Sequence, residues 1–575
     1  GIIVKKLVVK IKENSNIVVQ ILCVMVIAFM CLCDITKMNY PVINGDAFGY
    51  WSNAVSMSGY DWTDLISRNA YYSWGYSLWL VPIVKILPHG LWYKAAIILN
   101  AMFLIASYFL AYRTARILFP QVKNIVISLV ALVVIIYPCN ILYAQETWTE
   151  SLLYMLMWCA TFLVVSMDVK FSYPKFFLLY VILGYMYIVH ARCIGIVGVG
   201  IVISVIILCR NKKSIIAGAI AIAVLGVMYF ANNAIKDYII GSFYGNSETS
   251  GINNVGLDSG TVLSYLTKAF TNIGMLFKSL TTKSAYVFLM SGFSIIPAVF
   301  MCVSKIVRLI KERRDELLVS HIWCVTAFMA SLALCSLQMM DWSVRKDLAV
   351  YSRYFENAGG PLLMLGIIYL IEASPKIRLS VIAGYVINLL VMPHVLYYIY
   401  NAGGYFNSVC SPAFGALYDN TGSTETLGRL IFGIESFFIM IPIACIVINE
   451  KKFTTIFTIA MYGVMYIIIN IAGRGYLLDY REALDNRLEP MRTIIESEEN
   501  AKVYYLCESI RDDSVEILQY MLYSSKIQVV EDETEVTGDA AYILSDKMIV
   551  ANDDAIYNVM YQRDGVYLYK YERVN

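Results

Sequence analysis

Apolar stretches of about 20 residues recur along most of the chain and are separated by short polar turns. A transmembrane α-helix needs roughly 20 consecutive apolar residues, and inside a bilayer only helices and closed barrels satisfy their own backbone groups. The pattern therefore predicts an all-α polytopic membrane protein with about thirteen transmembrane helices. The predicted spans run over 16–34, 91–112, 124–140, 149–167, 174–190, 194–209, 214–231, 285–304, 320–339, 357–372, 379–399, 428–449 and 453–471.

Lysine and arginine are distributed unevenly among the turns between these spans. Every second turn is basic, beginning with the lysine-rich segment before the first span, and such an excess is typical of cytoplasmic turns. We therefore expect a multi-pass protein of a bacterial-type cytoplasmic (plasma) membrane, with its N-terminus inside and its C-terminal region outside. The inner turns carry Arg113, Arg116, Lys123, Lys170, Lys175, Arg210, Lys212, Lys213, Lys305, Arg308, Lys311, Arg313, Arg314, Lys376, Arg378, Lys451 and Lys452.

Two long segments lie outside the regular alternation of spans and turns. Residues 35–90 form the first outer loop, and within it the stretch 74–87 is apolar but too short to span, which is typical of a helix lying along the membrane interface. Beyond the transmembrane domain, 1–475, the periodicity alternates between strand-like and helix-like. Residues 476–575 are therefore predicted to form a linker, to about residue 500, and a small soluble extracytoplasmic α/β domain.

Composition supports this class and excludes others. The chain is 59% hydrophobic and only 15% charged, above the apolar share of a soluble domain. It contains no CxxC spacing, P-loop or HExxH motif, and we expect no nucleic-acid partner.

Carboxylates near two predicted helix ends are the first candidates for chemistry. Asp46 lies in the sequence GDAFG of the first outer loop, and a carboxylate within reach of a hydroxyl can act as a general base. Glu146 and Glu150 lie four residues apart at the outer start of the fourth span, so they share one helix face. Alternatively, Asp46 caps the next helix, and the two glutamates merely suit a helix N-terminus. Asp61 and Asp64, in YDWTDL, are more typical of such caps.

Basic side chains on the predicted outer face form the second group of candidates. His190 and Arg192 follow the fifth span in VHARCIG, and a later outer loop contains Arg345, Lys346 and Arg353. Arginine runs against the positive-inside bias there, and its planar guanidinium matches phosphate oxygens, so an anionic partner is one explanation. The alternative is local pairing with Asp341, Asp347 or Glu356.

Several of these segments together resemble the GT-C glycosyltransferase superfamily. The resemblance rests on an odd number of spans near thirteen, GDAFGYW in the first outer loop, the juxtamembrane stretch YYSWGYSLWLVPI, the helix start TESLLYML and the turn ARCIGI. It is closest to the branch that contains the lipid A aminoarabinose transferase and the protein O-mannosyltransferases, and it covers about residues 16–471. The Asp-Glu pair of the mannosyltransferases is absent, because Ala47 follows Asp46, and the WWD signature of oligosaccharyltransferases is absent too.

The resemblance implies transfer of a sugar from a polyprenyl-phosphate or polyprenyl-diphosphate donor to an extracytoplasmic envelope glycan, lipid or protein. It implies that Asp46 is the general base of an inverting reaction. Glu150 would position the acceptor or, with Asp46, hold a divalent cation such as Mg²⁺ or Mn²⁺. The residues implied in substrate binding are Arg192 and Arg353 at the donor phosphate, His190, Tyr354 and, more weakly, Glu146.

Two other classes remain open at this point. A transporter or flippase for lipid-linked sugars would place charged or broken helices at mid-membrane, whereas here the charges cluster at predicted outer helix ends. A polymerase of lipid-linked envelope polysaccharide would use similar outer arginines.

Overall fold

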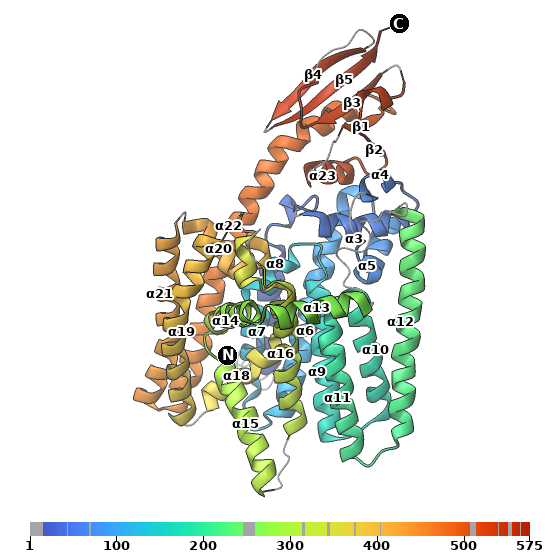
Figure 1. Ribbon diagram of the computed structural model, residues 1–575. Coiled ribbons are helices and arrows are strands. Elements are labelled where there is room, and N and C mark those ends of the chain that lie inside the picture. The colour runs from blue at the N-terminus through green and yellow to red at the C-terminus, as the bar shows by residue number, and fades with distance from the viewer. Residues whose placement is uncertain are drawn as a thin grey trace, which may run out of the picture.

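The computed structural model shows a bundle of long helices with a small β-sheet beyond one end (Figure 1). We refer to that end of the bundle as the sheet end. The structure describes residues 15–42, 44–67, 71–244, 259–312, 317–341, 345–372, 375–402, 404–421, 423–506, 513–538, 540–549, 555–563 and 565–574.

Nine helices in the described part of the chain are long and apolar enough to cross a membrane. Three of them are extended at the N- or C-terminus by the short 3₁₀ turns η1 (Ile35–Lys37), η2 (His89–Leu91) and η3 (Ala191–Cys193). The nine are α2 (Ser15–Leu32), α6 (Trp92–Leu118), α9 (Glu150–Val169), α11 (Ile194–Arg210), α12 (Ile215–Phe243), α16 (Leu318–Gln338), α19 (Pro375–Asn401), α21 (Thr424–Ile448) and α22 (Lys451–Glu496).

Three further apolar segments are sharply bent. The bends are 62° between α7 (Asn124–Ile135) and α8 (Pro138–Ala144), 105° between α14 (Ile273–Met290) and α15 (Ile295–Glu312), and 84° between η5–α17 and α18. The last segment comprises η5 (Lys346–Val350), α17 (Arg353–Glu356) and α18 (Gly360–Glu372). Counting each bent pair as one span gives up to 12 spans, and the helix α10 (Tyr173–Val189) is apolar but shorter. The number thirteen therefore stays a prediction.

The span expected over 285–304 is not one straight helix, because it contains the 105° bend. Gly292 adopts a positive φ of 54° at this bend, and a Cβ there would lie 2.5 Å from the Phe438 ring. Glycine is the residue that takes this conformation without strain, so the sequence breaks the helix locally.

The first loop folds into three helices against the sheet end of the bundle: α3 (Asn44–Ser56), α4 (Thr63–Ile66) and α5 (Trp74–Ile86). The stretch 74–87, expected as an interfacial helix, is α5. Close approaches fix these helices, since a Cβ on Gly49 would lie 2.0 Å from Tyr72, and one on Gly75 would lie 2.7 Å from the Val189 backbone.

The C-terminal region forms a five-stranded sheet of order β2-β1-β3-β5-β4. Strand β1 pairs in parallel with β2 and β3, whereas β5 pairs antiparallel with β3 and β4, and α23 lies between β1 and β2 in the chain. Residues 476–496, expected as a linker, continue helix α22 from the bundle to the sheet. The elements are β1 (Val503–Leu506), α23 (Asp513–Met521), β2 (Ile527–Val530), η7 (Glu533–Glu535), β3 (Ala540–Ser545), β4 (Ala555–Arg563) and β5 (Val566–Arg573).

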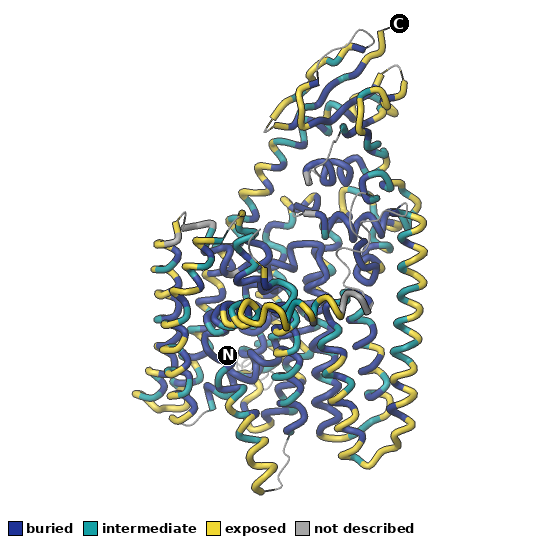
Figure 2. The backbone as a smooth tube through the Cα atoms, viewed as in Figure 1, coloured by how far each residue is buried: buried dark blue, intermediate teal, exposed yellow. Residues whose placement is uncertain are grey.

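Buried residues concentrate along the axis of the bundle, whereas α12, α13 (Ser259–Thr271) and parts of α19 and α21 are exposed (Figure 2). The turn that joins α11 to α12 and the C-terminal end of α15 lie away from the sheet end. Both belong to the turns with excess lysine and arginine. Near the sheet end, η6 (Ser408–Cys410) and α20 (Pro412–Thr421) pack beside α22.

Candidate functional site

A cavity of about 620 Å³ lies where the first loop, α17, the 405–410 segment and α22 meet. Its wall is mostly polar and aromatic. It is lined by Gly45, Asp46, Tyr50, Tyr71, Tyr72, Ser73, His190, Met339, Arg345, Tyr351, Arg353, Tyr354, Tyr405, Phe406, Asn407, Val409, Cys410, Tyr476 and Tyr480.

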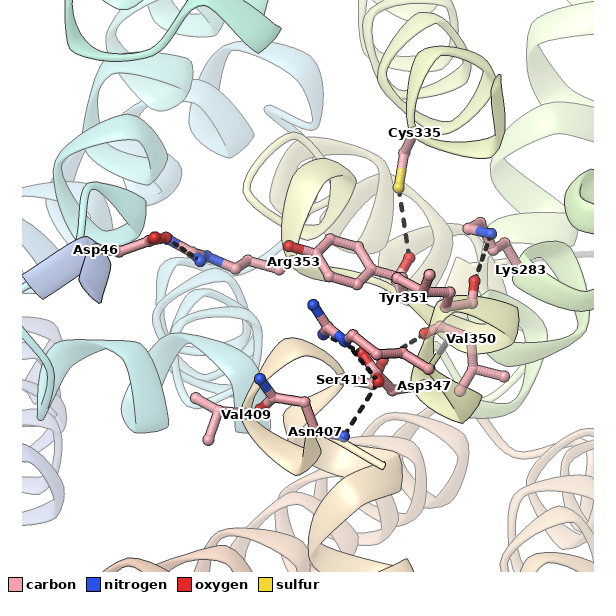
Figure 3. Close-up of polar contacts among 12 residues, drawn as sticks. Asp46, Lys283, Cys335, Asp347, Val350, Tyr351, Arg353, Asn407, Val409 and Ser411 are labelled. Carbon is pink, nitrogen blue, oxygen red and sulfur yellow. Dashed lines mark hydrogen bonds and ion pairs between the residues drawn. The ribbon is translucent and has the colours of Figure 1, made fainter. Parts of the chain in front are cut away.

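Asp46 and Arg353 meet in this cavity. Asp46 lies in the first turn of α3, and Arg353 begins α17. The Arg353 Nη1 donates a 2.5 Å hydrogen bond to Asp46 Oδ2, and the two side chains point toward one another in Figure 3. The Asp46 side chain is 24% exposed, whereas that of Arg353 is 3% exposed. The carboxylate therefore faces the cavity while the guanidinium is held in the wall.

Glu150 and Arg192 extend this ion pair behind the cavity wall. Glu150 Oε1 accepts from Arg353 Nε at 2.7 Å and from Arg192 Nη2 at 2.8 Å. Both partners of each bond are buried, so each charged group is shielded from water and contacts its oppositely charged partner instead. Two arginines and two carboxylates thus form one network of ion pairs. It is buried except at Asp46, which faces the cavity.

Three nitrogen donors of these two arginines lack a hydrogen-bond partner among the described residues. They are buried nitrogens, namely Arg192 Nε, Arg192 Nη1 and Arg353 Nη2. A buried donor without an acceptor costs about 1–3 kcal/mol, more when it is charged. An anion that reached these nitrogens would supply the missing acceptors.

Aromatic rings hold both arginines in place. The Arg353 guanidinium lies 3.7 Å from the Trp148 ring centroid, and that of Arg192 lies 4.6 Å from the Tyr354 ring centroid. Such cation–π contacts favour the charged guanidinium in a desolvated site. Tyr354 also lines the cavity and lies beside His190, with ring centroids 5.7 Å apart.

His190 is a neutral imidazole in this setting. Its Nδ1 accepts a 3.3 Å hydrogen bond from the Arg192 backbone N–H, which requires an unprotonated Nδ1. Burial, with Arg192 and Arg353 nearby, holds the pKa of His190 well below its usual range. The side chain can still offer Nε2–H to a ligand in the cavity.

Glu146 is not brought to the cavity. Its carboxylate is 3.3 Å from Arg481 Nη2 and accepts from the Tyr93 hydroxyl at 3.3 Å, fully buried between α6 and α22. The two glutamates that share a sequence spacing therefore face different partners, because the chain turns between α8 and α9 before the helix begins at Glu150.

Two arginines of the later loop, Arg345 and Arg353, also have different kinds of partner. Arg345 lines the cavity but pairs with the buried Asp347, whose Oδ1 also accepts from the Asn407 backbone N–H at 3.1 Å (Figure 3). Local pairing, the alternative to an anionic partner, thus holds for Arg345. Arg353 instead pairs with residues far away in the chain. Lys346 donates its backbone N–H to the Tyr405 carbonyl.

Sequence reasoning missed much of the cavity wall. Eight of the lining residues are tyrosines, and Trp148 lies under Arg353. The chain contains 44 tyrosines, so their type alone marks no site. The position of Tyr50, one helical turn after Asp46, is the signal that could have identified one of them.

A divalent cation does not fit the carboxylates in this arrangement. Asp46 and Glu150 both accept from the Arg353 guanidinium, which lies between them where a cation would have to bind. Among the described residues, no group of three or more His, Cys, Asp or Glu side chains could hold a metal ion. We therefore derive no step through a metal.

The fold of the described helices and sheet is the GT-C fold that the resemblance of the sequence implied. The structure is similar to that of ArnT from Cupriavidus metallidurans, solved bound to undecaprenyl phosphate and in the apo state. In both cases the TM-score is 0.54 and the identity 13%, over 97% of this chain and 98% of that chain. An oligosaccharyltransferase from Archaeoglobus fulgidus aligns with a TM-score of 0.36 and 12% identity over 72% of this chain and 56% of that chain. No protein-family model and no curated protein matches the sequence.

Proposed function

We propose that the protein is a membrane glycosyltransferase that moves a sugar from a polyprenyl-phosphate or polyprenyl-diphosphate donor to an acceptor hydroxyl outside the cytoplasm. The observation that carries the proposal is the hydrogen bond between the cavity-facing Asp46 and Arg353, together with buried guanidinium N–H groups that have no acceptor among the described residues. The GT-C fold supports it, since the ArnT structure with this fold was solved bound to undecaprenyl phosphate.

The donor phosphate would bind beside Arg353 and Arg192, at guanidinium nitrogens that Glu150 does not occupy. Their three unsatisfied nitrogens can donate to phosphate oxygens, and guanidinium groups bind phosphate through paired N–H groups. Trp148 and Tyr354 keep the two planes oriented, so little reorganisation accompanies binding. His190 and Tyr354 add polar groups on the cavity side.

Asp46 would act as the base. It accepts the proton of the acceptor hydroxyl while that oxygen attacks the anomeric carbon, and the bond from this carbon to the phosphate oxygen breaks with inversion. The phosphate leaves with the electron pair, and the two arginines stabilise its added negative charge. Glu150, shared by both guanidinium groups, fixes their separation.

The ion pair between Asp46 and Arg353 suggests an order of events. Arg353 Nη1 occupies Asp46 Oδ2, so transfer of this hydrogen bond to the phosphate would free that oxygen for the proton of the acceptor. The donor phosphate would compete for Arg353 and release Asp46. Acceptor activation would then follow donor binding.

We place the sheet end outside the cytoplasm, in a bacterial-type plasma membrane. The basic turns lie at the opposite end of the bundle, as the positive-inside rule requires for that orientation. The cavity and the C-terminal α/β domain, which we assign to about residues 500–575, would then both face the envelope, where a glycan, lipid or protein acceptor is available.

The test is turnover of an undecaprenyl-phosphate-linked sugar by the purified protein, read as transfer to an acceptor or to water. We expect Asp46→Asn to abolish turnover and to retain binding of undecaprenyl phosphate. Asp61→Asn is the matched control, because Asp61 lies in the same loop but does not line the cavity: its Oδ1 accepts from the Thr63 N–H at 3.0 Å and its Oδ2 pairs with Lys526 at 3.1 Å. Unchanged turnover in Asp46→Asn would refute the assigned base, and transport of intact donor into liposomes would favour a flippase.

A further inference from the structure

Glu356 is a buried carboxylate that the reaction above does not use. It ends the single-turn helix α17, three residues after Arg353, and it is 6% exposed. Its Oε1 accepts from the hydroxyls of Tyr137 at 2.8 Å and Tyr286 at 2.7 Å. Its Oε2 accepts from the Ser352 hydroxyl at 2.6 Å and from the Cys139 thiol. Both carboxylate oxygens are therefore fully engaged.

These donors come from segments that are far apart in the sequence. Tyr137 and Cys139 flank the start of α8, and Tyr286 belongs to α14. Helix α8 leads directly to the turn that carries Trp148 and then to Glu150. The Glu356 carboxylate thus connects the helical turn that carries Arg353 to the segment that carries Trp148 and Glu150, two of the residues that contact Arg353.

A second close approach supports this connection. Gly360, the first residue of α18 after the bend, packs against Tyr154 of α9, and a Cβ there would lie 2.5 Å from the Tyr154 hydroxyl. Glu150 begins α9, so the bend after Glu356 and the helix of Glu150 are in direct contact. Glu356 and Gly360 thus connect the segment that contains α17 to α8 and to α9, the helix that begins at Glu150.

None of the four hydrogen-bond donors to Glu356 carries a positive charge. Ion pairing therefore does not explain why a carboxylate occupies this position, whereas the number of acceptor sites does. A carboxylate offers about four lone-pair sites, and a glutamine offers fewer acceptors and adds a donor. Replacing Glu356 by glutamine would leave some of the buried hydroxyls without an acceptor and let α17 shift.

We propose that Glu356 is a positioning residue for the donor-phosphate site: through Tyr137, Cys139 and Tyr286 it fixes the Arg353 guanidinium relative to Glu150. The inference rests on the proposed function, because it assigns a purpose to the placement of Arg353. Among the described residues, none of the four hydrogen-bond partners of Glu356 lines the cavity.

The test measures binding of undecaprenyl phosphate to the purified protein in nanodiscs, together with the melting temperature. We expect Glu356→Gln to weaken binding about tenfold, and Tyr137→Phe and Tyr286→Phe to weaken it less, in the same direction. Glu435→Gln is the matched control: Glu435 is also buried in a membrane helix, α21, where it accepts from Asn388 at 2.6 Å. That variant should bind like the wild type.

A double-mutant cycle separates positioning from general stability. If Glu356 acts through Arg353, the effect of Glu356→Gln should largely disappear in an Arg353→Lys background, because lysine lacks the planar fork whose orientation Glu356 fixes. An equal loss in both backgrounds would refute the positioning role. If Glu356→Gln does not fold, the same cycle is run with Tyr286→Phe, which keeps the carboxylate.

The outcomes distinguish this inference from the proposed function. Wild-type binding that is lost in Arg353→Gln but unchanged in Glu356→Gln, Tyr137→Phe and Tyr286→Phe would refute the inference and leave the function standing. A wild-type protein that fails to bind undecaprenyl phosphate would refute both.

Discussion

Arg353 donates a 2.5 Å hydrogen bond to Asp46 in the wall of the cavity, although the two residues lie 307 positions apart in the chain. Through its Nε the same guanidinium reaches Glu150 at 2.7 Å. One planar group therefore sets the distance between the proposed base and the buried carboxylate behind it.

Arg353→Gln should lower turnover of an undecaprenyl-phosphate-linked sugar by roughly a hundred- to a thousandfold, the range found when one transition-state donor is removed. Both Asp46 and Glu150 would lose their shared partner, and the phosphate would lose a cation. Arg353→Lys keeps the charge but not the fork, so an intermediate loss is expected. Turnover of both variants at the wild-type rate would contradict the assignment.

Glu150→Gln and Glu146→Gln should differ in their effect on turnover. Glu150 Oε1 is shared by two guanidinium groups, so its neutralisation should lower turnover about a hundredfold. Glu146 pairs with Arg481 away from the cavity, so its neutralisation should cost about 3 kcal/mol of stability by leaving a buried charge unpaired. Melting temperature and turnover measured together on both variants check this. Lost turnover with unchanged melting in Glu146→Gln would contradict the placement of that residue.

The same pair shows what the sequence could and could not predict. Hydrophobic runs and basic turns predicted the membrane class, most helix positions and one common side of the membrane for Asp46, Arg192 and Arg353, because each depends on local composition. A spacing of four residues predicted one shared face for Glu146 and Glu150. The chain turns between α8 and α9 instead, and only tertiary packing decides which carboxylate meets which arginine.

The bent segments were not predictable for a related reason. A stretch such as 285–304 has the apolar length of one span, but its path is decided at Gly292, where Phe438 of a distant helix leaves no room for a side chain. Likewise, the polar and charged sequence after residue 475 is typical of a linker. Contacts with the first loop, such as the hydrogen bond that Arg481 Nη1 donates to the Tyr40 carbonyl at 2.9 Å, accompany its helical form instead.

His190 should make the protein less stable in mild acid. Because the pKa of His190 is held well below its usual value in the folded protein, the unfolded chain binds a proton there as the pH falls through about 6.5, and the folded protein does not. Stability is therefore lost below about pH 6.5, by at most about 1.4 kcal/mol per pH unit. In His190→Gln, whose amide oxygen can still accept from the Arg192 N–H, the drop in melting temperature between pH 7.5 and pH 5.5 should be smaller. An identical drop in both proteins would contradict a buried neutral histidine.

The C-terminal domain should stabilise the helix that carries Asp46. Tyr520 of α23 packs edge-on against Trp51 of α3 at 5.2 Å between ring centroids, and Trp62 Nε1 donates to the Tyr523 carbonyl at 2.9 Å. Trp51 in turn donates to Thr147, in the turn before Glu150, at 3.0 Å. Trp51 therefore contacts both the C-terminal domain and the turn that precedes Glu150.

Two variants at this interface test which contact matters. Tyr520→Ala removes a fully buried ring, so it should cost about 3 kcal/mol and lower turnover as α3 loosens. Lys526→Ala removes ion pairs to Asp61 at 3.1 Å and Asp64 at 2.8 Å that are partly exposed, so it should cost less than about 1 kcal/mol. Melting temperature and turnover of an undecaprenyl-phosphate-linked sugar are measured for both. If Tyr520→Ala melts earlier but turns over normally below its melting temperature, the domain supports folding without positioning Asp46. If the two variants behave alike, the aromatic contact does not connect the domain to the site.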